Sequence, residues 1–351
     1  MTALALAELD VLSEAAQHLD AAAVAAMVRE RYRMQGVLSA LSGERDRNYL
    51  LQTQEGWRYM LKVSHPRETP LVADFQTRAL LHVARVAPDL PVQRIVPAHG
   101  GEPSFLWQPP DGRQRVVRMF SYLPGKPLPE APRTPLQRIR LARTLARLDA
   151  ALSGFDHPAG ELALPWDIQR ADSVRGLLDG IDDAGRRAQA GEALAAFERH
   201  VKPGLPGLRR QPIHNDLNIY NVLVGEEDTD RIAAILDFGD MVKAPLINDL
   251  AVACAYQMGE EGDPLEEVLP FVAAYHAVLP LTAVEVDLLF DLMLARLLMV
   301  VAISGWRARC YPDNAPYLLR NNAPSWARLA GGLRLGRDAA RRRLRAACGL
   351  H

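Results

Sequence analysis

Two polar clusters set inside apolar runs constrain this chain more than any other feature. The segment PIHNDLNIYNVLV, residues 212–224, carries Asp216 and Asn221. The segment AILDFGD, residues 234–240, carries Asp237. Burying a polar group without a partner costs about 2–7 kcal/mol in the harsher reference states. These clusters therefore need partners, either within the protein or in a ligand, and they indicate a chemical site.

Phosphoryl transfer explains why these residue types occur together. It requires that a triphosphate be positioned and its charge neutralised, and it requires little covalent chemistry from the protein. Mg²⁺ prefers oxygen ligands and usually takes one or two protein groups. The amide of Asn221 and the carboxylate of Asp237 would meet that need. Asp216 could orient an attacking hydroxyl group and accept its proton.

A rare lysine supplies the third part of the pattern. The chain has 41 Lys plus Arg, but its lysines are only Lys62, Lys126, Lys202 and Lys243. Lys62 stands inside the strand-like run YMLKV, where its ammonium could reach the phosphates as a point charge. The alternative is an edge-strand lysine whose head reaches solvent. The two other clusters favour the phosphate role.

These motifs resemble the protein-kinase-like fold, in which D-x-x-x-x-N precedes D-F-G and a strand lysine lies upstream. Because the loop reads HND and not HRD, the chain is most similar to the aminoglycoside phosphotransferase and choline kinase branch. Three segments also resemble hydroxylysine kinases and the kinase-like domains fused to class III aminotransferases: LSGERDRNYLL, DFQTRALLHV and ILDFGDM. The likeness covers residues 35–328.

The resemblance implies a role for each matching residue. Asp216 corresponds to the catalytic base, Asn221 and Asp237 to the Mg²⁺ ligands, and Lys62 to the lysine that binds the phosphates of ATP or GTP. His214 would be structural and would support the loop that carries Asp216.

Asp249, in INDLAVA, matches a helix-start aspartate that braces this loop in the family. Simple capping of its helix is an equal alternative.

Three departures from the family pattern affect the expected site. The turn SALSGERDRNY has one glycine and no G-x-G-x-x-G, so Ser42, Gly43 and backbone N–H groups would serve the phosphates. The helix after Lys62 has no obvious glutamate to pair with it, and Asp74 is the favoured carboxylate. Asn215 replaces a glycine of the loop, a change that we expect to be tolerated.

The pattern along the chain predicts an α+β protein with a bilobal protein-kinase-like fold. Two apolar runs around TQEG predict a hairpin over residues 49–63, and helical spacing predicts a helix over residues 72–88. From residue 134 onward helices dominate, except over residues 213–238. The expected parts are an N-terminal helical extension (1–34), a small β-rich nucleotide-binding N-lobe (35–120), a hinge connector (121–127) and a larger helical C-lobe with the catalytic loop and acceptor pocket (128–351).

The sequence says less about the nucleotide base and the acceptor than about the phosphate and metal sites. Backbone groups near Phe120 and Tyr122 would pair with the base edge, which leaves ATP and GTP open. Asp240, Arg296 and Arg307 are candidate acceptor-binding residues, because an ammonium needs carboxylates and a carboxylate needs arginine. The resemblance implies a small hydroxylated amino acid or amine, hydroxylysine first. Alternatives are aminoglycoside, homoserine, choline or ethanolamine kinases, or a catalytically silent nucleotide-binding regulator.

Composition narrows the partners further. The net charge of -1 argues against nucleic-acid binding by bulk electrostatics. The apolar stretch 288–304 is interrupted by Asp291 and Arg296, which favours a core helix over a membrane span. No secretory signal is evident, and the three scattered cysteines are typical of reduced thiols in a cytoplasmic protein. We expect a monomer or dimer with Mg²⁺ and a nucleoside triphosphate as its cofactors.

Overall fold

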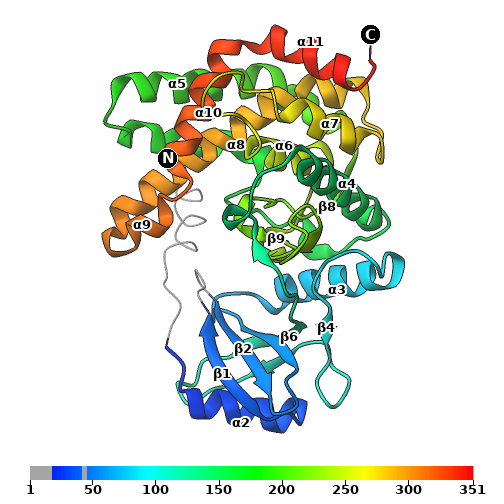
Figure 1. Ribbon diagram of the computed structural model, residues 1–351. Helices are drawn as coiled ribbons and strands as arrows, with labels where there is room; N and C mark the ends of the chain where they lie inside the picture. Colours follow the sequence, from blue (N-terminus) through cyan, green and yellow to red (C-terminus); the bar gives the residue numbers. More distant parts are fainter. Residues whose placement is uncertain (1–17, 42–45, 351) are drawn as a thin grey trace. The chain divides into compact units, whose positions relative to one another are not determined.

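The computed structural model describes residues 18–41 and 46–350 of the chain (Figure 1). The chain forms two compact units, and the main boundary between them lies between Pro124 and Gly125. The short segment His157–Ala159 belongs with the N-terminal unit. The boundary falls within the residues that the sequence pattern marks as a connector.

An antiparallel sheet forms the centre of the N-terminal unit. Its strand order is β1-β2-β3-β6-β4, and β5 pairs with the same β6. The apolar runs around TQEG form the β2–β3 hairpin, with Leu51 opposite Tyr59 and Asn48 opposite Lys62. The predicted hairpin is confirmed. The strands of this unit are β1 (Gly36–Leu41), β2 (Arg47–Thr53), β3 (Arg58–Val63), β4 (Ile95–Val96), β5 (Phe105–Trp107) and β6 (Arg115–Ser121).

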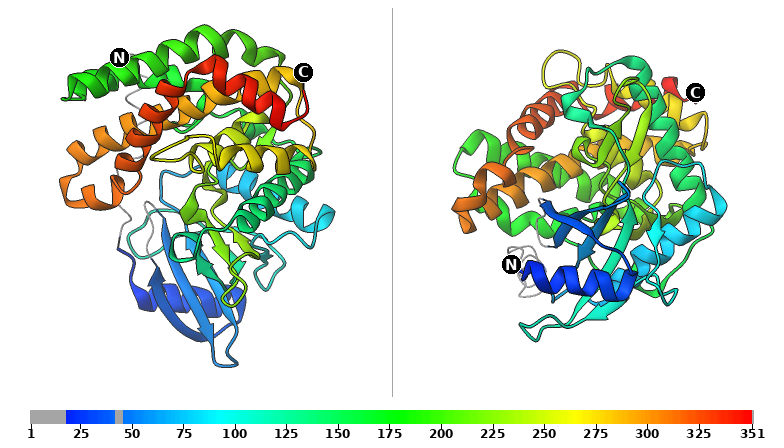
Figure 2. Two further views of the ribbon diagram at one scale, coloured as in Figure 1. Left: turned by 45° about the horizontal axis from the view of Figure 1, so that its top comes forward. Right: turned by 60° about the horizontal axis from the view of Figure 1, so that its bottom comes forward.

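Two helices accompany this sheet. Helix α2 (Ala21–Tyr32) begins at the N-cap Asp20, whose side chain accepts from two backbone N–H groups. Its apolar face packs with the sheet residues Leu51 and Leu61 into one core, and Figure 2 shows the helix lying across the strands. Helix α3 (Pro70–Val86) has Thr69 as its N-cap and a proline in its first turn. The predicted helix over residues 72–88 is therefore confirmed.

The C-terminal unit begins with short strands that carry the candidate site. Strands β10, β9 and β7 form one small sheet, and β11 pairs with β8. Gly125 stands where the chain enters this unit, and a Cβ atom there would lie 2.7 Å from the Val224 carbonyl oxygen. Only glycine permits that approach. The strands are β7 (Lys126–Pro127), β8 (Arg210–Ile213), β9 (Val222–Val224), β10 (Ile232–Ile235) and β11 (Val242–Pro245).

Helices make up the rest of the C-terminal unit. The long helix α8 (Ala283–Cys310) begins with a capping box formed by Thr282 and Glu285. Helices α5, α10 and α11 pack around it, as Figure 2 shows. The other helices are α4 (Pro135–Leu152), α5 (Ala184–Ala196), α6 (Ile247–Ala255), α7 (Val268–His276), α9 (Ala315–Leu318), α10 (Asn322–Leu335) and α11 (Arg337–Ala347).

Short helical turns fill the connections between these elements. They are η1 (Leu128–Glu130), η2 (Pro158–Glu161), η3 (Ile168–Gly180), η4 (Phe197–Val201), η5 (Lys202–Gly207), η6 (Ile219–Asn221), η7 (Phe238–Asp240) and η8 (Pro312–Asn314).

The apolar stretch 288–304 is a core helix, because it forms the middle of α8 and is buried throughout. Within the described residues, no helix is both long and apolar enough to span a membrane. The thiol of Cys254 is buried, that of Cys348 is partly covered and that of Cys310 is exposed, and all three are free thiols.

Candidate active site

The β9–β10 hairpin brings the two candidate metal ligands together. Asn221 lies directly before β9, and Asp237 lies two residues after β10. The Leu236 N–H donates to the Asn221 carbonyl oxygen over 2.8 Å, which closes this end of the hairpin. Asp237 has a left-handed backbone with φ of 59°, and its Oδ1 accepts from the Gly239 N–H at 3.1 Å. Both side chains therefore start from the same end of one hairpin.

Three side-chain donors hold the carboxylate of Asp216. Its Oδ2 accepts from Nδ2 of Asn218 and from Nδ2 of Asn221, each at 2.8 Å. Its Oδ1 accepts from Nη2 of Arg296 at 2.7 Å. Hydrogen bonds to a charged acceptor are stronger and shorter than neutral ones. The orientation of this carboxylate is therefore fixed by its neighbours.

Arg296 comes from the middle of α8, and its side chain is only 3% exposed. Its Nη1 donates to the Trp166 carbonyl oxygen at 3.2 Å. The guanidinium carbon lies 5.1 Å from the Trp166 ring centroid and 6.0 Å from that of Tyr256. Burial alone would lower the pKa of Arg296, but Tyr256 and Asp216 raise it above its ordinary value. A charged guanidinium is therefore held beside Asp216.

Burial raises the pKa of Asp216 above its usual range. Arg296 and the Asn218 amide oppose that rise. A carboxylate that accepts a proton from a substrate works best when its pKa approaches the working pH. The environment of Asp216 moves it in that direction and keeps an opposite charge at hand.

The loop that carries Asp216 is supported from behind by two side chains. His214 Nδ1 accepts from the Asp216 N–H at 3.2 Å, and its Nε2 contacts the Leu236 carbonyl oxygen at 2.9 Å. Nε2 therefore carries the ring proton in this arrangement. Asp249 accepts from the N–H groups of His214 and Asn215 at 2.9 and 2.7 Å. The structure thus gives Asp249 the bracing contact, and it shows no side-chain cap on α6.

Asn215 stands where the family pattern has a glycine. Its φ is 66°, in the left-handed region that favours glycine and tolerates asparagine. Its Nδ2 donates to the Asp240 carbonyl oxygen at 3.1 Å, which ties the loop to the turn after Asp237. The side chain therefore compensates for part of the backbone cost.

The donor set at the hairpin end fits a hard divalent cation. Nδ2 of Asn221 donates to Asp216, both to its carboxylate and to its carbonyl oxygen at 2.9 Å, so the amide oxygen is the atom that remains for a metal ion. Asp237 adds a carboxylate from the adjoining turn. An amide oxygen and a carboxylate, completed by phosphate and water, form a set that suits Mg²⁺. Within the described ranges, no cluster of three or more His, Cys, Asp or Glu side chains could hold a metal ion alone.

Lys62 lies in the N-terminal unit, on β3. Its Nζ pairs with Asp46 Oδ2 at 2.9 Å, and Asp46 Oδ1 accepts from the His65 N–H at 2.8 Å. Burial would raise the pKa of Asp46, but the Lys62 ammonium and the His65 N–H hold it below its ordinary value. Sequence reasoning missed Asp46, although this residue lies directly before β2, the strand that pairs with β3.

The expectation that Asp74 pairs with Lys62 is wrong. Asp74 Oδ1 accepts from Arg78 one turn further along α3 at 3.2 Å, and its Oδ2 contacts His157 at 3.1 Å. Asp74 faces Arg78 and His157. Lys62 instead pairs with Asp46, which lies next to the β2–β3 hairpin. The buried helix position is instead Gln76, which accepts from Arg118.

The residues expected around the nucleotide base lie at the end of β6. Phe120 is buried and pairs in register with Met60 and Ile95. Tyr122 is partly buried, and the Arg58 guanidinium lies 4.2 Å from its ring centroid. The Ser121 N–H already donates to the Arg94 carbonyl oxygen at 2.8 Å. Ser42 and Gly43, the expected phosphate-binding residues of the turn, lie outside the described residues.

The candidate acceptor residues differ in their relation to Asp216. Asp240 acts electrostatically on Arg296, which in turn donates to the carboxylate of Asp216. Arg307 is buried on α8 but follows Arg296 by about three helical turns.

Three other residues contact Asp216 or Arg296. Sequence reasoning missed Asn218, although it is an amide two residues after Asp216. Trp166 and Tyr256, whose rings lie near the Arg296 guanidinium, come from segments far away in the chain.

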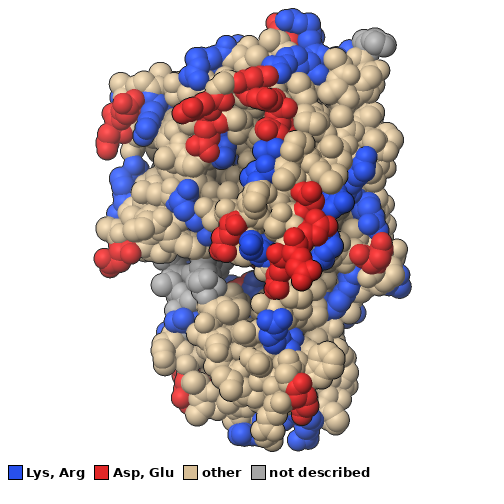
Figure 3. All heavy atoms as spheres, viewed as in Figure 1, with Lys and Arg blue, Asp and Glu red and all other residues tan. Residues whose placement is uncertain are grey.

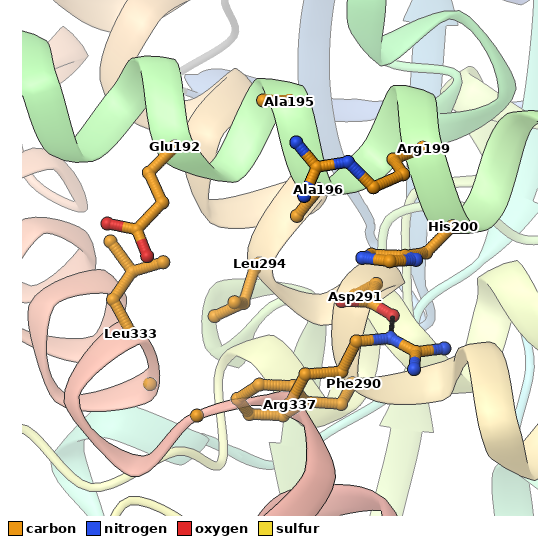
Figure 4. A pocket seen from close by; sticks show the side chains of 12 residues that line it. Glu192, Ala195, Ala196, Arg199, His200, Phe290, Asp291, Leu294, Leu333 and Arg337 are labelled. Atoms are coloured by element: carbon orange, nitrogen blue, oxygen red, sulfur yellow. Dashed lines mark hydrogen bonds and ion pairs between the residues drawn. The ribbon is translucent and has the colours of Figure 1, made fainter.

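A separate hollow of about 220 Å³ lies elsewhere in the C-terminal unit (Figure 4). It lies among α5, η4, α8 and the junction of α10 and α11, and Asp291 and Arg337 pair within it at 2.6 Å. None of its lining residues belongs to the loop of Asp216.

Basic and acidic side chains are interspersed on the face shown in Figure 3, so that face presents no broad field of one charge.

The chain has a kinase-like fold. The chain matches the model of the phosphotransferase enzyme family over residues 37–284, and it belongs to that family. It is a small-molecule kinase whose acceptor is a hydroxyl group.

Particular relatives narrow the comparison. The chain is 26% identical over 302 residues to hydroxylysine kinase of Mus musculus, which covers 82% of this chain and 80% of the relative. An aminopropanol kinase associated with a microcompartment is similar in structure, with a TM-score of 0.69 and 23% identity over 93% of this chain and 98% of the other. The amicoumacin kinase hAmiN, in complex with AMP-PNP, Ca²⁺ and Ami, has a TM-score of 0.67 and 14% identity over 93% of this chain and 96% of the other.

Proposed function

We propose that the protein transfers the γ-phosphate of ATP or GTP to the hydroxyl group of a small hydroxylated amino acid or amine, with hydroxylysine as the first candidate. The observation that carries this proposal is the geometry around Asp216. One carboxylate is oriented by Asn218, Asn221 and Arg296, and the hairpin end that holds Asn221 also holds Asp237. The likeness to hydroxylysine kinases over most of the chain supports the choice of acceptor.

In this proposal Asp216 is the catalytic base. Its Oδ1 and Oδ2 are held in place, so an acceptor hydroxyl that approaches in line with the γ-phosphate meets an oriented proton acceptor. The opposite charge on Arg296 keeps the carboxylate ionised until the proton is transferred. A buried base of this kind does not need to reorganise during the reaction.

The amide oxygen of Asn221 and the carboxylate of Asp237 would hold Mg²⁺. The metal ion, when bound, neutralises charge that develops on the phosphate oxygens. Lys62 would bind the phosphates through its ammonium, in place of its present contact with Asp46. Backbone groups near Phe120 and Tyr122 would contact the base.

The acceptor would be recognised by charge. Asp240 would attract its ammonium group, and the aromatic rings of Trp166 and Tyr256 would add cation–π attraction. Arg307 is the candidate partner for an acceptor carboxylate. These features suit a small zwitterion or amine, and they make hydroxylysine a better candidate than a large polycationic aminoglycoside.

A substrate panel tests this proposal. Hydroxylysine, homoserine, choline, ethanolamine, aminopropanol and an aminoglycoside are each incubated with ATP or GTP and Mg²⁺, and phosphorylated products are detected by mass spectrometry. We expect turnover with a hydroxylated amino acid and a loss of at least about 100-fold in Asp216→Asn. Unchanged turnover in this variant would contradict the assignment of the base. Nucleotide binding without turnover of any acceptor would favour the silent regulator.

A further inference from the structure

A second polar network lies behind the loop that carries Asp216, inside the C-terminal unit. Asp149 on α4 and Asp249 on α6 are both fully buried. The charge and the side chain of Asp249 act directly on the carboxyl of Asp149, so the two groups lie next to each other, and we call these two residues the buried carboxyl pair. Two carboxyl groups in contact are unusual in a protein interior, because two carboxylates repel and both lose their hydration.

The hydrogen-bond pattern shows where a proton fits in this pair. Both oxygens of Asp249 already accept from backbone N–H groups of the loop, those of His214 and Asn215. Asp149 Oδ2 accepts from the Tyr275 hydroxyl at 2.5 Å. No donor reaches Asp149 Oδ1 within the part of the chain that the structure describes. A hydrogen bond between two carboxyl groups requires that one of them be a donor, and Oδ1 is the oxygen that is left for this proton.

Among the described residues, the groups that act on the Asp149 carboxyl are Asp249 and Tyr275, and neither supplies a positive charge to stabilise a second carboxylate. Helix α4 packs against α7, β8 and β10. Helix α7 contributes Tyr275, β8 contributes the uncharged Gln211, which donates to the Asp149 carbonyl oxygen at 2.6 Å, and β10 has no titratable side chain. Arg209 and Glu285, which both act electrostatically on Tyr275, pair with each other at 2.6 Å.

We propose that Asp149 is a neutral carboxylic acid that donates a hydrogen bond to Asp249 and thereby positions the loop of Asp216. Asp249 accepts from two backbone N–H groups, and Asp149 carries the proton. Asp149 is a positioning residue: it acts on the base through Asp249 and the loop backbone. The inference rests on the proposed function, in which that loop carries the catalytic base.

Burial supports this protonation state. It raises the pKa of Asp149 well above its ordinary value, and the charge of Asp249 acts in the same direction. Between the unfolded and the folded pKa, the native state binds this proton and the unfolded state does not. The stability that depends on Asp149 must therefore fall as the pH rises through this interval.

Stability measurements test the protonation state without any assay of catalysis. Asp149→Asn keeps the shape and supplies an N–H donor that does not titrate. Urea unfolding of the wild type and of this variant is compared from pH 5 to pH 8. We expect the unfolding equilibrium constant of the wild type to rise relative to Asp149→Asn by up to about tenfold per pH unit. A difference that does not change with pH would mean that Asp149 is ionised in the native state, and it would overturn the proposal.

A matched control comes from an acid with the opposite environment. The pKa of Asp111 is lowered to about 2 by its hydrogen bonds to Arg115 and Arg113. Its folded and unfolded pKa values both lie below the tested range. The difference between the wild type and Asp111→Asn should therefore stay constant from pH 5 to pH 8.

Kinetics then test the positioning role. Asp149→Asn should retain kcat within about threefold, because the donor to Asp249 is preserved. Asp149→Leu removes that donor and should lower kcat about 10- to 100-fold with a smaller change in KM, since a misplaced base affects the chemical step. Leu148→Ala, a buried neighbour on α4 without polar contacts, serves as the control for general destabilisation. Equal kcat in Asp149→Leu and the wild type, or an equal loss in Asp149→Asn and Asp149→Leu, would overturn the positioning role.

The two proposals can fail separately. Full activity of Asp216→Asn would refute the base assignment, yet the pH dependence of stability in the wild type would persist. A flat pH dependence would refute the neutral carboxyl group, yet Asp216→Asn would still be inactive.

Discussion

At the scale of single residues, the environment of Asp216 combines burial with three donors. The two amides, Asn218 and Asn221, act on one oxygen, and Arg296 acts on the other. The charged partner and the neutral partners therefore affect the carboxylate in different ways. The amides set the direction of the carboxylate, and the guanidinium offsets the cost of burying its charge.

Replacement of Arg296 tests how much its charge contributes to the function of Asp216. Arg296→Met leaves a buried carboxylate without its cation, so we expect kcat to fall about 10- to 100-fold. Arg296→Lys should restore part of it, because an ammonium keeps the charge but not the planar fork. Steady-state kinetics measure the effect. Arg328→Met, which breaks another buried arginine's pair with Glu260, is the control. Wild-type kcat in Arg296→Met would show that the pair is only structural.

Asn218 and Asn221 allow a matched comparison of metal binding and base orientation. Both donate to the same oxygen of Asp216 at 2.8 Å, but only Asn221 is a proposed metal ligand. Asn221→Ala should lower kcat and raise the Mg²⁺ concentration for half-maximal rate about 10- to 100-fold. Asn218→Ala should lower kcat without that shift. Mg²⁺ titrations of the initial rate distinguish the two, and equal shifts in both variants would argue against Asn221 as a ligand.

At the scale of elements, short strands and the turns at their ends place most of the site. The β9–β10 hairpin sets Asn221 beside Asp237, and the β2–β3 hairpin sets Asp46 beside Lys62. In each case residues far apart in a linear motif become neighbours through antiparallel pairing. The long helix α8 then adds Arg296 from a distant part of the chain.

The Asp46–Lys62 pair should make a measurable contribution to stability. Asp46→Asn should lower the free energy of unfolding at pH 7 by about 1–3 kcal/mol, because the two side chains are mostly buried. The pKa of Asp46 is lowered in the folded state. Its contribution is therefore present above the unfolded value of about 3.9 and is lost as the pH falls through the folded value. Urea unfolding of both proteins at pH 7 and at pH 3 checks this. A difference of the same size at both pH values would be inconsistent with an ionic contribution.

Sequence patterns anticipated some parts of the site better than others. The motifs D-x-x-x-x-N and D-F-G lie on one continuous stretch, so their local spacing was enough to indicate that Asp216, Asn221 and Asp237 belong together. Asp74 was assigned to Lys62 from its place in a helix, but the direction in which a helix faces depends on packing that no local pattern encodes. Asp149 carries no motif at all, because its partners come from other helices.

At the scale of the whole molecule, the proposed Mg²⁺ would serve catalysis, and the fold would not depend on it. In the portion of the chain described by the structure, no protein-only cluster of metal-binding side chains is present, and most of the buried side chains in both units are apolar. The proposed Mg²⁺ site has two protein ligands and depends on phosphate oxygens to complete it.

Removal of Mg²⁺ should therefore separate stability from nucleotide binding. We expect EDTA to leave the Tm of the protein alone unchanged within about 1 °C, and to abolish most of the rise in Tm that ATP produces. Differential scanning fluorimetry with and without ATP measures both. A large drop in Tm on chelation without nucleotide would indicate a structural metal instead.

The position of α2 limits how far the N-terminus of this protein can be truncated. The family model begins at residue 37, after this helix, yet Val24, Met27 and Val28 share a core with the strands of the N-terminal unit. The segment recognisable by descent is thus shorter than the segment that folds. A chain that begins at the family boundary would expose the apolar face of the sheet to water. We expect such a chain to be insoluble, although it would keep every proposed catalytic group.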